Sequence, residues 1–267
     1  MFKKKYSTLA LESPSENLLL IRLNRPEVAN AINTQLGLEL EEVFSNLSRS
    51  GSEFGFRCIV LSGSGDRHFC AGGDLKERYG MTDEQFLAQH QIFERMILAL
   101  QDCPIPVVAA VNGPAYAGGC ELVLACDFVY ASREARFALT EASLGIMPGC
   151  GGTQNLPRAV GMRRAKELIL SARPFSAEEA YEWGLVNKLC EHGQVLHDAL
   201  ATASTICANA PLSLRQVKRA MDHGQRMDSR TAMFFEVDAY NRLVTTADRR
   251  EGIAAFNEKR KPDFKGA

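Results

Sequence analysis

Short apolar runs alternate with longer amphipathic segments along the first half of the chain. Residues 18–23, 58–61 and 106–111 are rich in β-favouring apolar side chains and are bounded by turn residues, so each run predicts a strand. Between the first two runs, leucine and valine recur at helical spacing after Asn33, which predicts a capped helix as far as about Asn46. Together these segments predict a strand–helix–strand unit.

Later segments continue this alternation and then lose it. Thr82 and Gln85 have the spacing of a capping box, which predicts a helix that runs to about residue 100. After a break at residues 112–114, a helix is expected at residues 118–125 and strands are expected at residues 128–131 and 136–139. Beyond about residue 148 the strand signals nearly vanish, and helices are expected at residues 165–170, 177–182, 195–209, 212–221, 231–243 and 247–258.

Alternation of strands and helices is typical of parallel β units that are covered by helices. The chain has 267 residues, enough to bury a sizeable α/β core and to add a small appendage. The boundary between them is soft and lies near residues 190 to 210. We place the core at residues 1–200 and a helical region at residues 201–267.

Composition and charge limit which binding partners and which cellular compartment are expected. The chain carries 31 basic and 32 acidic residues, a net charge of −1, so no polyanion-binding surface is indicated and nucleic acid is not an expected partner. No run of about eighteen apolar residues occurs, so no membrane span is expected. Residues 1–6 lead into strand-like alternation and not into a secretory signal, which favours a cytoplasmic location. Eight cysteines are scattered without the paired spacing of a zinc site, so we expect reduced core cysteines and no metal.

Two glutamates and two glycine-rich segments carry the candidate chemistry. Glu121 lies in the segment AGGCEL at 117–122, Glu141 lies in LTEA at 139–142, and the turn CAGGDL at 70–75 is upstream of both. Carboxylates can take and give protons, while preorganised backbone N–H groups can hold a developing oxyanion. This combination predicts an enzyme that adds water to, or moves a proton on, an activated acyl group.

Motifs of other enzyme classes are missing or misplaced. A serine or cysteine hydrolase needs a histidine base, yet the histidines at 68, 90, 192, 197 and 223 all lie outside the catalytic-looking segments. Neither GxGxxG after the first strand nor GxxxxGK[ST] occurs, which argues against enzymes that use dinucleotides or ATP.

Five segments in chain order resemble the crotonase superfamily, the enoyl-CoA hydratase/isomerase family. They are LNRP at 23–26, FCAGGDLK at 69–76, residues 106–127, PGCGGTQ at 148–154 and RREGIAAF at 249–256. The resemblance implies a crotonase-like (ClpP/crotonase) core of repeated ββα units and a helical C-terminal trimerisation region. It also implies a homotrimer, or a homohexamer built as a dimer of trimers. The substrate is then an acyl-coenzyme A thioester, and no cofactor is needed beyond the coenzyme A that the substrate carries.

The resemblance also assigns roles to particular residues. The amides of Gly73 and Gly118 form the oxyanion hole, and Glu121 and Glu141 match the family's two acid/base positions. We assign Glu121 as the base that activates water and Glu141 as the acid that protonates Cα, and the division of roles between the two stays open. The implied reaction is syn addition of water across the Cα=Cβ bond of a 2-enoyl-CoA thioester. Isomerases of the family usually manage with one glutamate, so two favour hydration. The alternatives are a Δ3-Δ2-enoyl-CoA isomerase and a 3-hydroxyacyl-CoA dehydratase.

Substrate-binding positions follow from the same resemblance. The loop after residue 24 and the turn around Gly73 resemble the family's coenzyme A contacts, which assigns substrate binding to Arg25, Val28, Ala29, Ala71, Gly72, Asp74, Leu75 and Lys76. Lys76 and the basic cluster that begins with Lys259 are candidates for the phosphates. Some relatives bind RNA through lysine-rich helices, but the expected helix after Asn33 contains no lysine.

Three features bear on the acyl group. Asn155 stands where the family often has arginine, and Cys150 stands where alanine or glycine is commoner, and both can alter packing beneath the site. The segment 77–100 is expected to form part of the acyl pocket wall through Tyr79, Met81, Phe86 and Phe93. Acyl length and branching cannot be read from these residues.

Overall fold

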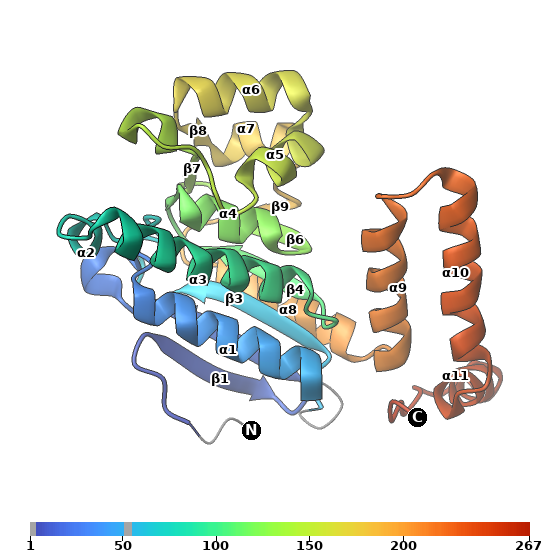
Figure 1. The fold of residues 1–267 in the computed structure, drawn as a ribbon. Coiled ribbons are helices and arrows are strands. Elements are labelled where there is room, and N and C mark those ends of the chain that lie inside the picture. Colours follow the sequence, from blue (N-terminus) through green and yellow to red (C-terminus); the bar gives the residue numbers. More distant parts are fainter. Residues whose placement is uncertain (1–3, 51–54) are drawn as a thin grey trace.

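A mainly parallel sheet runs through the main body of the molecule (Figure 1). The computed structural model describes residues 4–50 and 55–267, so the first residues of the predicted N-terminal alternation, 1–3, lie outside the described residues. The first and second strands pair antiparallel and all other neighbours pair parallel. In sheet order the strands are β1 (Leu9–Ser15), β2 (Leu18–Leu23), β3 (Cys58–Gly63), β4 (Val107–Val111), β6 (Phe128–Ser132) and β9 (Lys188–Cys190).

Both faces of this sheet are covered, which explains the continuous apolar runs in its central strands. Every residue of β3 and β4 is buried. Because successive side chains of a strand point to opposite faces, residues of β2, β3 and β4 divide between two apolar clusters. One cluster contains residues of α1 (Thr34–Ser50) and α3 (Asp83–Gln101), and the other contains residues of α8 (Val195–Cys207).

The two helices on the first face begin at the caps that the sequence indicates. The Asn33 side chain accepts a hydrogen bond from the Leu36 amide at 2.9 Å. Thr82 and Gln85 form both bonds of a capping box at the start of α3. Each cap pairs backbone N–H groups that the first helical turn leaves without a partner.

A second, three-stranded sheet supports the cavity described below. It consists, in order, of β5 (Ala115–Tyr116), β7 (Arg136–Ala138) and β8 (Phe175–Ser176). The first pair is parallel and the second is antiparallel. The other short helices of the chain before β9 are η1 (Pro26–Val28), α2 (Leu75–Arg78), α4 (Gly118–Ala125), η2 (Glu141–Leu144), α5 (Gly152–Val160), α6 (Met162–Ser171) and α7 (Ala177–Glu182).

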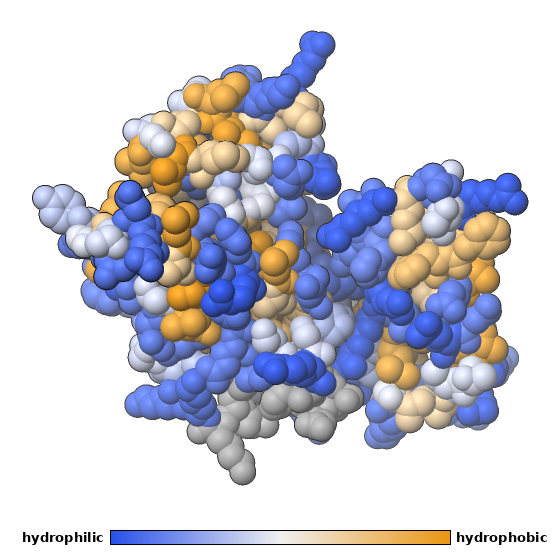
Figure 2. Space-filling view, in the orientation of Figure 1, coloured by the Kyte–Doolittle hydropathy of each residue, from blue (hydrophilic) through white to orange (hydrophobic). Residues whose placement is uncertain are grey.

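The C-terminal helices extend away from the sheets (Figure 1). They are α9 (Pro211–Gly224), α10 (Ser229–Val244) and α11 (Ala247–Asn257). Lys218 ties α9 to the main body, because its Nζ lies 2.8 Å from a carboxylate oxygen of Asp127. Figure 2 shows apolar side chains on the exposed surface of this region, and the exposed apolar residues there include Val217, Met221, Met233, Phe234, Val237, Tyr240 and Phe256. Apolar surface of this extent is typical of a protein interface.

Three elements beyond residue 148 depart from the expected pattern. Strand signals nearly vanish beyond about residue 148, yet β8 and β9 lie there, and with two and three residues they are too short to show alternation. The helix α5 was not expected, because it begins at a glycine and contains Pro157, and both residues disfavour helices. The helix α8 includes residue 200 and packs on the main sheet along its length. The division of the chain into a core and a helical region at residue 200 stays a prediction.

Two further findings concern cysteine and membranes. All eight cysteines are unpaired, and all but Cys126 are buried. Within the described ranges, no helix has both the length and the apolar character needed to cross a membrane.

Candidate active site

Strand register brings the glycine-rich turns and the glutamates to one edge of the structure. Cys70 bridges Ala115 in parallel, and Ala115 pairs in parallel with Phe137 on the next strand. Parallel segments leave a sheet at the same edge, so residues a few positions further along each segment become neighbours. Gly73 and Gly118 each lie three positions beyond a paired residue, and Glu141 lies four beyond Phe137.

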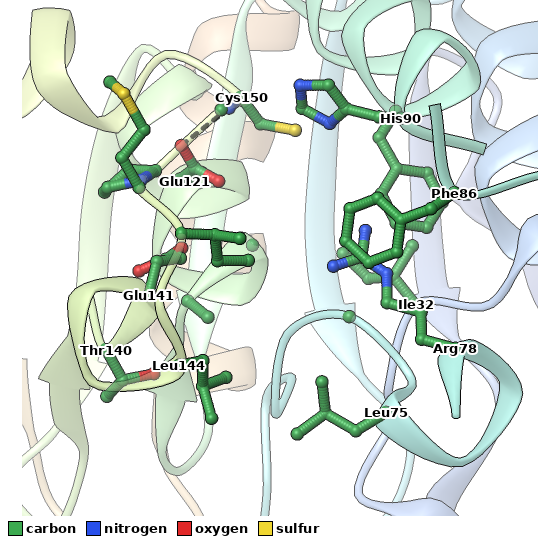
Figure 3. A pocket seen from close by; sticks show the side chains of 18 of the residues that line it. Ile32, Leu75, Arg78, Phe86, His90, Glu121, Thr140, Glu141, Leu144 and Cys150 are labelled. Carbon is green, nitrogen blue, oxygen red and sulfur yellow. Dashed lines mark hydrogen bonds between the residues drawn. The ribbon is translucent and has the colours of Figure 1, made fainter. Parts of the chain in front are cut away.

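A cavity of about 450 Å³ opens at this edge. One wall comes from α4, η2 and the segment 146–150, and the other comes from α2 and α3. Figure 3 shows the two walls facing each other, with Glu121, Glu141, Leu144 and Cys150 on one side and Leu75, Arg78, Phe86 and His90 on the other.

The amides of Gly73 and Gly118 lie at the same part of the cavity lining. The Ile32 amide donates to the Gly72 carbonyl at 2.7 Å and the Asp74 amide donates to the Ile32 carbonyl at 2.9 Å, so the Gly73 N–H points away from Ile32. A Cβ built on Gly118 would lie 3.8 Å from the Gly73 nitrogen. Across the described residues, neither N–H donates to another protein group. Two unpaired donors in one cavity can receive an oxyanion.

Glu121 is held by backbone amides where the chain enters α5. Its side chain is buried, and its Oε1 accepts hydrogen bonds from the amides of Cys150 at 2.8 Å and Gly152 at 2.9 Å. Burial raises the pKa of Glu121, while the two N–H donors oppose this change. Both donors bind the same oxygen, so Oε2 stays available to a ligand in the cavity.

Glu141 lacks the backbone donors that bind Glu121. Its Oε2 is buried and has no hydrogen-bond partner. Burial raises the pKa of Glu141 to about 7, and the neighbouring charge of Glu121 adds to the increase. A carboxyl group with this pKa can both hold and release a proton near neutral pH.

The predicted coenzyme A contacts divide into two groups. Ala71 and Leu75 line the cavity together with Gly73. Arg25 and Asp74 instead pair with each other at 2.9 Å. The other predicted contacts, Val28, Ala29, Gly72, Lys76 and Lys259, also lie outside the cavity lining.

Those outer positions nevertheless shape the site. Asp74 caps α2 by accepting from the amides of Lys76 and Glu77. Ala29 has a positive φ of 54°, and its carbonyl accepts from the Ala71 amide at 3.0 Å. Gly72 has a φ of 94°, and an added Cβ would lie 2.8 Å from the Tyr116 carbonyl oxygen, so no other residue fits there. The loop before α1 and the turn before α2 are therefore fastened together.

The acyl-wall prediction holds for part of the segment only. Phe86 and Phe93 line the cavity. Tyr79 is 95% exposed, and neither it nor Met81 lines the cavity, so their placement in the wall was wrong. Both precede α3, whose inward face begins only at Phe86.

Several lining residues were not identified from the sequence. Arg78, His90, Met96 and Met147 all line the cavity. His90 was set aside because no catalytic-looking motif contains it. Its position was nevertheless readable, because Phe86, His90 and Phe93 recur at the four- and three-residue spacing of one helical face.

A sequence model of the enoyl-CoA hydratase/isomerase family matches residues 13–267. The chain belongs to the enoyl-CoA hydratase/isomerase family. Crotonyl-CoA hydratase of Syntrophomonas wolfei is 38% identical over 262 residues, which are 97% of this chain and 98% of that protein. The 2,3-dehydroadipyl-CoA hydratase of Escherichia coli is 38% identical over 255 residues, 95% and 97% of the two chains. The crystal structure of an enoyl-CoA hydratase from Bacillus anthracis has a TM-score of 0.94 at 39% identity, and the match covers 98% of this chain and all of that one.

These comparisons confirm the predicted superfamily, the crotonase fold and the enzyme class, an enoyl-CoA hydratase. An acyl-CoA thioester substrate fits this family. The roles of individual residues, the oligomeric state and the absence of a metal or further cofactor stay predictions.

Proposed function

We propose that this enzyme catalyses the reversible syn addition of water across the Cα=Cβ bond of a 2-enoyl-CoA thioester. The observation that carries the proposal is the meeting of two unpaired amides and two buried carboxyl groups in one cavity. No cofactor is required beyond the coenzyme A of the substrate.

The first step forms a C–O bond at Cβ. Glu121, as the carboxylate, takes a proton from water while the water oxygen attacks Cβ, and the π electrons move onto the thioester carbonyl oxygen. The amides of Gly73 and Gly118 stabilise this enolate oxygen, and losing one such donor typically lowers kcat by roughly 10²–10³. The two N–H donors on Glu121 favour its charged form, which suits a base.

The second step forms a C–H bond at Cα. Glu141 delivers its proton to Cα as the enolate collapses back to the thioester. Its pKa of about 7 lets part of the population hold a proton at neutral pH, which suits an acid. The proton that Glu121 gained then returns to the pair through solvent, and dehydration is the same sequence reversed.

Crotonyl-CoA is the substrate that tests the reaction type. We expect the enoyl-thioester absorbance to fall as 3-hydroxybutyryl-CoA forms. Conversion of a 3-enoyl-CoA to a 2-enoyl-CoA without net hydration would instead identify the isomerase alternative. No reaction with any enoyl-CoA would refute the proposal.

The pH dependence of hydration tests whether Glu141 is the catalytic acid. Glu141 has a pKa raised from 4.5 to about 7, so it holds its proton below pH 7 and loses it above. We expect kcat/KM for hydration to fall as pH rises through about 7, and to fall again at acidic pH as Glu121 gains a proton. A ¹³C-carboxyl titration should show one resonance with a midpoint near pH 7 that is absent in Glu141→Gln. A midpoint near 4.5 for this group would contradict the assignment.

For coenzyme A, we propose that the Arg25 loop and the turn after Gly73 hold the pantetheine and adenine through main-chain groups. Lys76 is exposed on α2, next to the turn that carries Gly73, and supplies a charge for phosphate. Lys259 follows α11, and we propose that it serves the nucleotide of a neighbouring subunit.

We propose that the exposed apolar surface of α9 to α11 forms the interface of a homotrimer, or of trimers paired as a homohexamer. Val237 on α10 is 52% exposed. A carboxylate buried there would be unpaired, so Val237→Asp should shift the mass in light scattering towards the monomer. Asp238→Asn, at the next position, where the side chain is 59% exposed, is the control and should leave the mass unchanged. A monomeric wild-type protein would contradict the assembly.

A further inference from the structure

Arg78 places a positive charge on the wall of the cavity that faces the two glutamates (Figure 3). Its guanidinium stacks on Phe86 and Phe93, with Cζ at 4.5 and 5.2 Å from the two ring centroids. Its Nε donates to the Gln89 side-chain oxygen at 2.8 Å. Aromatic stacking and this one bond fix the orientation of the guanidinium.

No carboxylate of the described chain pairs with this guanidinium. Arg25, on the neighbouring loop, does have such a partner in Asp74. The nearest acidic side chain in sequence, Glu77, is already engaged by the Gln89 amide at 2.7 Å and the Thr34 amide at 2.9 Å. Across residues 4–50 and 55–267, Nη1 and Nη2 of Arg78 have no hydrogen-bond acceptor.

A half-buried guanidinium is stabilised when a ligand supplies hydrogen-bond acceptors to its free N–H groups. Burial lowers the pKa of Arg78, while nearby acidic groups, Glu77 and Glu141 among them, oppose this change. Apolar residues, with Met96, Leu144 and Ile146 among them, make up much of the lining, which also contains the polar residues His90, Glu121, Thr140 and Glu141. A purely hydrocarbon acyl group would therefore leave Nη1 and Nη2 of Arg78 without a hydrogen-bond acceptor.

We infer that the acyl group of the substrate carries a carboxylate, which the free Nη1 and Nη2 atoms of Arg78 bind. The inference rests on the proposed hydration and specifies its substrate class, a 2-enoyl-CoA with a second acidic group. The two terminal nitrogens of a guanidinium match the two oxygens of a carboxylate, which gives a pair of parallel hydrogen bonds.

A second reading of the same position is an electrostatic role at the oxyanion. A Cβ built on Gly73 would lie 3.2 Å from Cζ of Arg78, so the guanidinium is close to one oxyanion donor. The stacking on Phe86 and Phe93 holds the guanidinium against α3, and Arg78 and Gly118 both line the cavity. The two readings differ in what they predict for neutral substrates, because an oxyanion forms from every enoyl thioester.

Matched substrate pairs test the inference. Glutaconyl-CoA is compared with 2-pentenoyl-CoA, and 2,3-dehydroadipyl-CoA with 2-hexenoyl-CoA, so that each pair differs only in a carboxylate for a methyl group. We expect wild-type kcat/KM to favour at least one acidic substrate over its neutral partner. Arg78→Met should lower kcat/KM for that acid by roughly 10²-fold, in line with removal of one partner of a buried charge pair, and should reverse the preference.

Two further variants serve as controls. Arg78→Lys keeps the charge but loses the two-nitrogen geometry, so it should retain part of the preference. Arg163→Met removes an exposed arginine on α6 and should behave as the wild type. Thermal unfolding of Arg78→Met shows whether the variant is folded. Its kcat/KM for the neutral substrate shows whether the catalytic site is still assembled.

The outcomes separate the inference from the proposed function. Equal losses for acidic and neutral substrates in Arg78→Met would overturn the carboxylate role and support the oxyanion reading. A wild type that hydrates only the neutral members would overturn the inference and leave the proposed hydration standing. Failure to hydrate any of the four substrates would count against the proposed function itself.

Discussion

Replacing either Glu121 or Glu141 with glutamine lowers kcat for hydration by roughly 10²–10⁴-fold, the usual contribution of a positioned acid or base. Glutamine keeps the shape of the side chain, and its oxygen can still accept from the Cys150 and Gly152 amides that hold Glu121. It can neither take nor give the required proton. The loss is measured from the initial rate of crotonyl-CoA hydration.

The double variant and a surface control complete this test. Because the two carboxyl groups act on one water and one substrate, the losses should not multiply in the double variant. Glu182→Gln, at an exposed position of α7, should hydrate like the wild type. Full activity in both single variants would exclude the two-carboxylate mechanism. A silent Glu141→Gln, with double-bond migration that depends on Glu121, would favour the isomerase.

Local signals predicted most of the helices and the central strands. The bounds expected for two helices, residues 118–125 and 177–182, are the bounds of α4 and α7. In α7 the reason is a capping box between Ser176 and Glu179, which marks the start within the sequence itself. Buried parallel strands were equally readable, because their apolar runs are continuous.

Pairing between distant short segments was not readable. The strand β5 has two residues and Cys70 joins the structure through a single bridge, so neither produces a periodic pattern. These same contacts bring Gly73, Gly118 and Glu141 together. Family resemblance located the residues, but only long-range register explains why they share a cavity.

Side chains that act from a helix face were missed for a different reason. Arg78 lies in the segment 77–100 that was expected to form part of the acyl pocket wall, but only Tyr79, Met81, Phe86 and Phe93 were named there, and Arg78, the last residue of α2, lines the cavity. Its importance depends on the absence of a partner carboxylate, which is a property of packing and not of spacing. The tertiary arrangement therefore carries information about the substrate that the motif does not.

Gly119→Ala should lower both activity and stability, because Gly119 lets α4 approach the turn that carries Gly73. An added Cβ would lie 2.3 Å from the Cys70 carbonyl oxygen and 2.8 Å from its Cβ, so α4 must move away. We expect the free energy of unfolding to fall by about 1–3 kcal/mol, as for overpacked cores. Moving the Gly118 amide from the oxyanion should lower kcat by roughly 10²–10³-fold.

Gly80→Ala provides the matched comparison for this variant. Gly80 is exposed, has no atom within 4 Å of an added Cβ and has no positive φ, so kcat and stability should change little. Chemical denaturation and the crotonyl-CoA rate are measured for both variants. If Gly119→Ala loses stability but keeps the wild-type kcat, the spacing of the two amides does not depend on this contact. If kcat falls while KM changes little, the contact sets the geometry that stabilises the enolate.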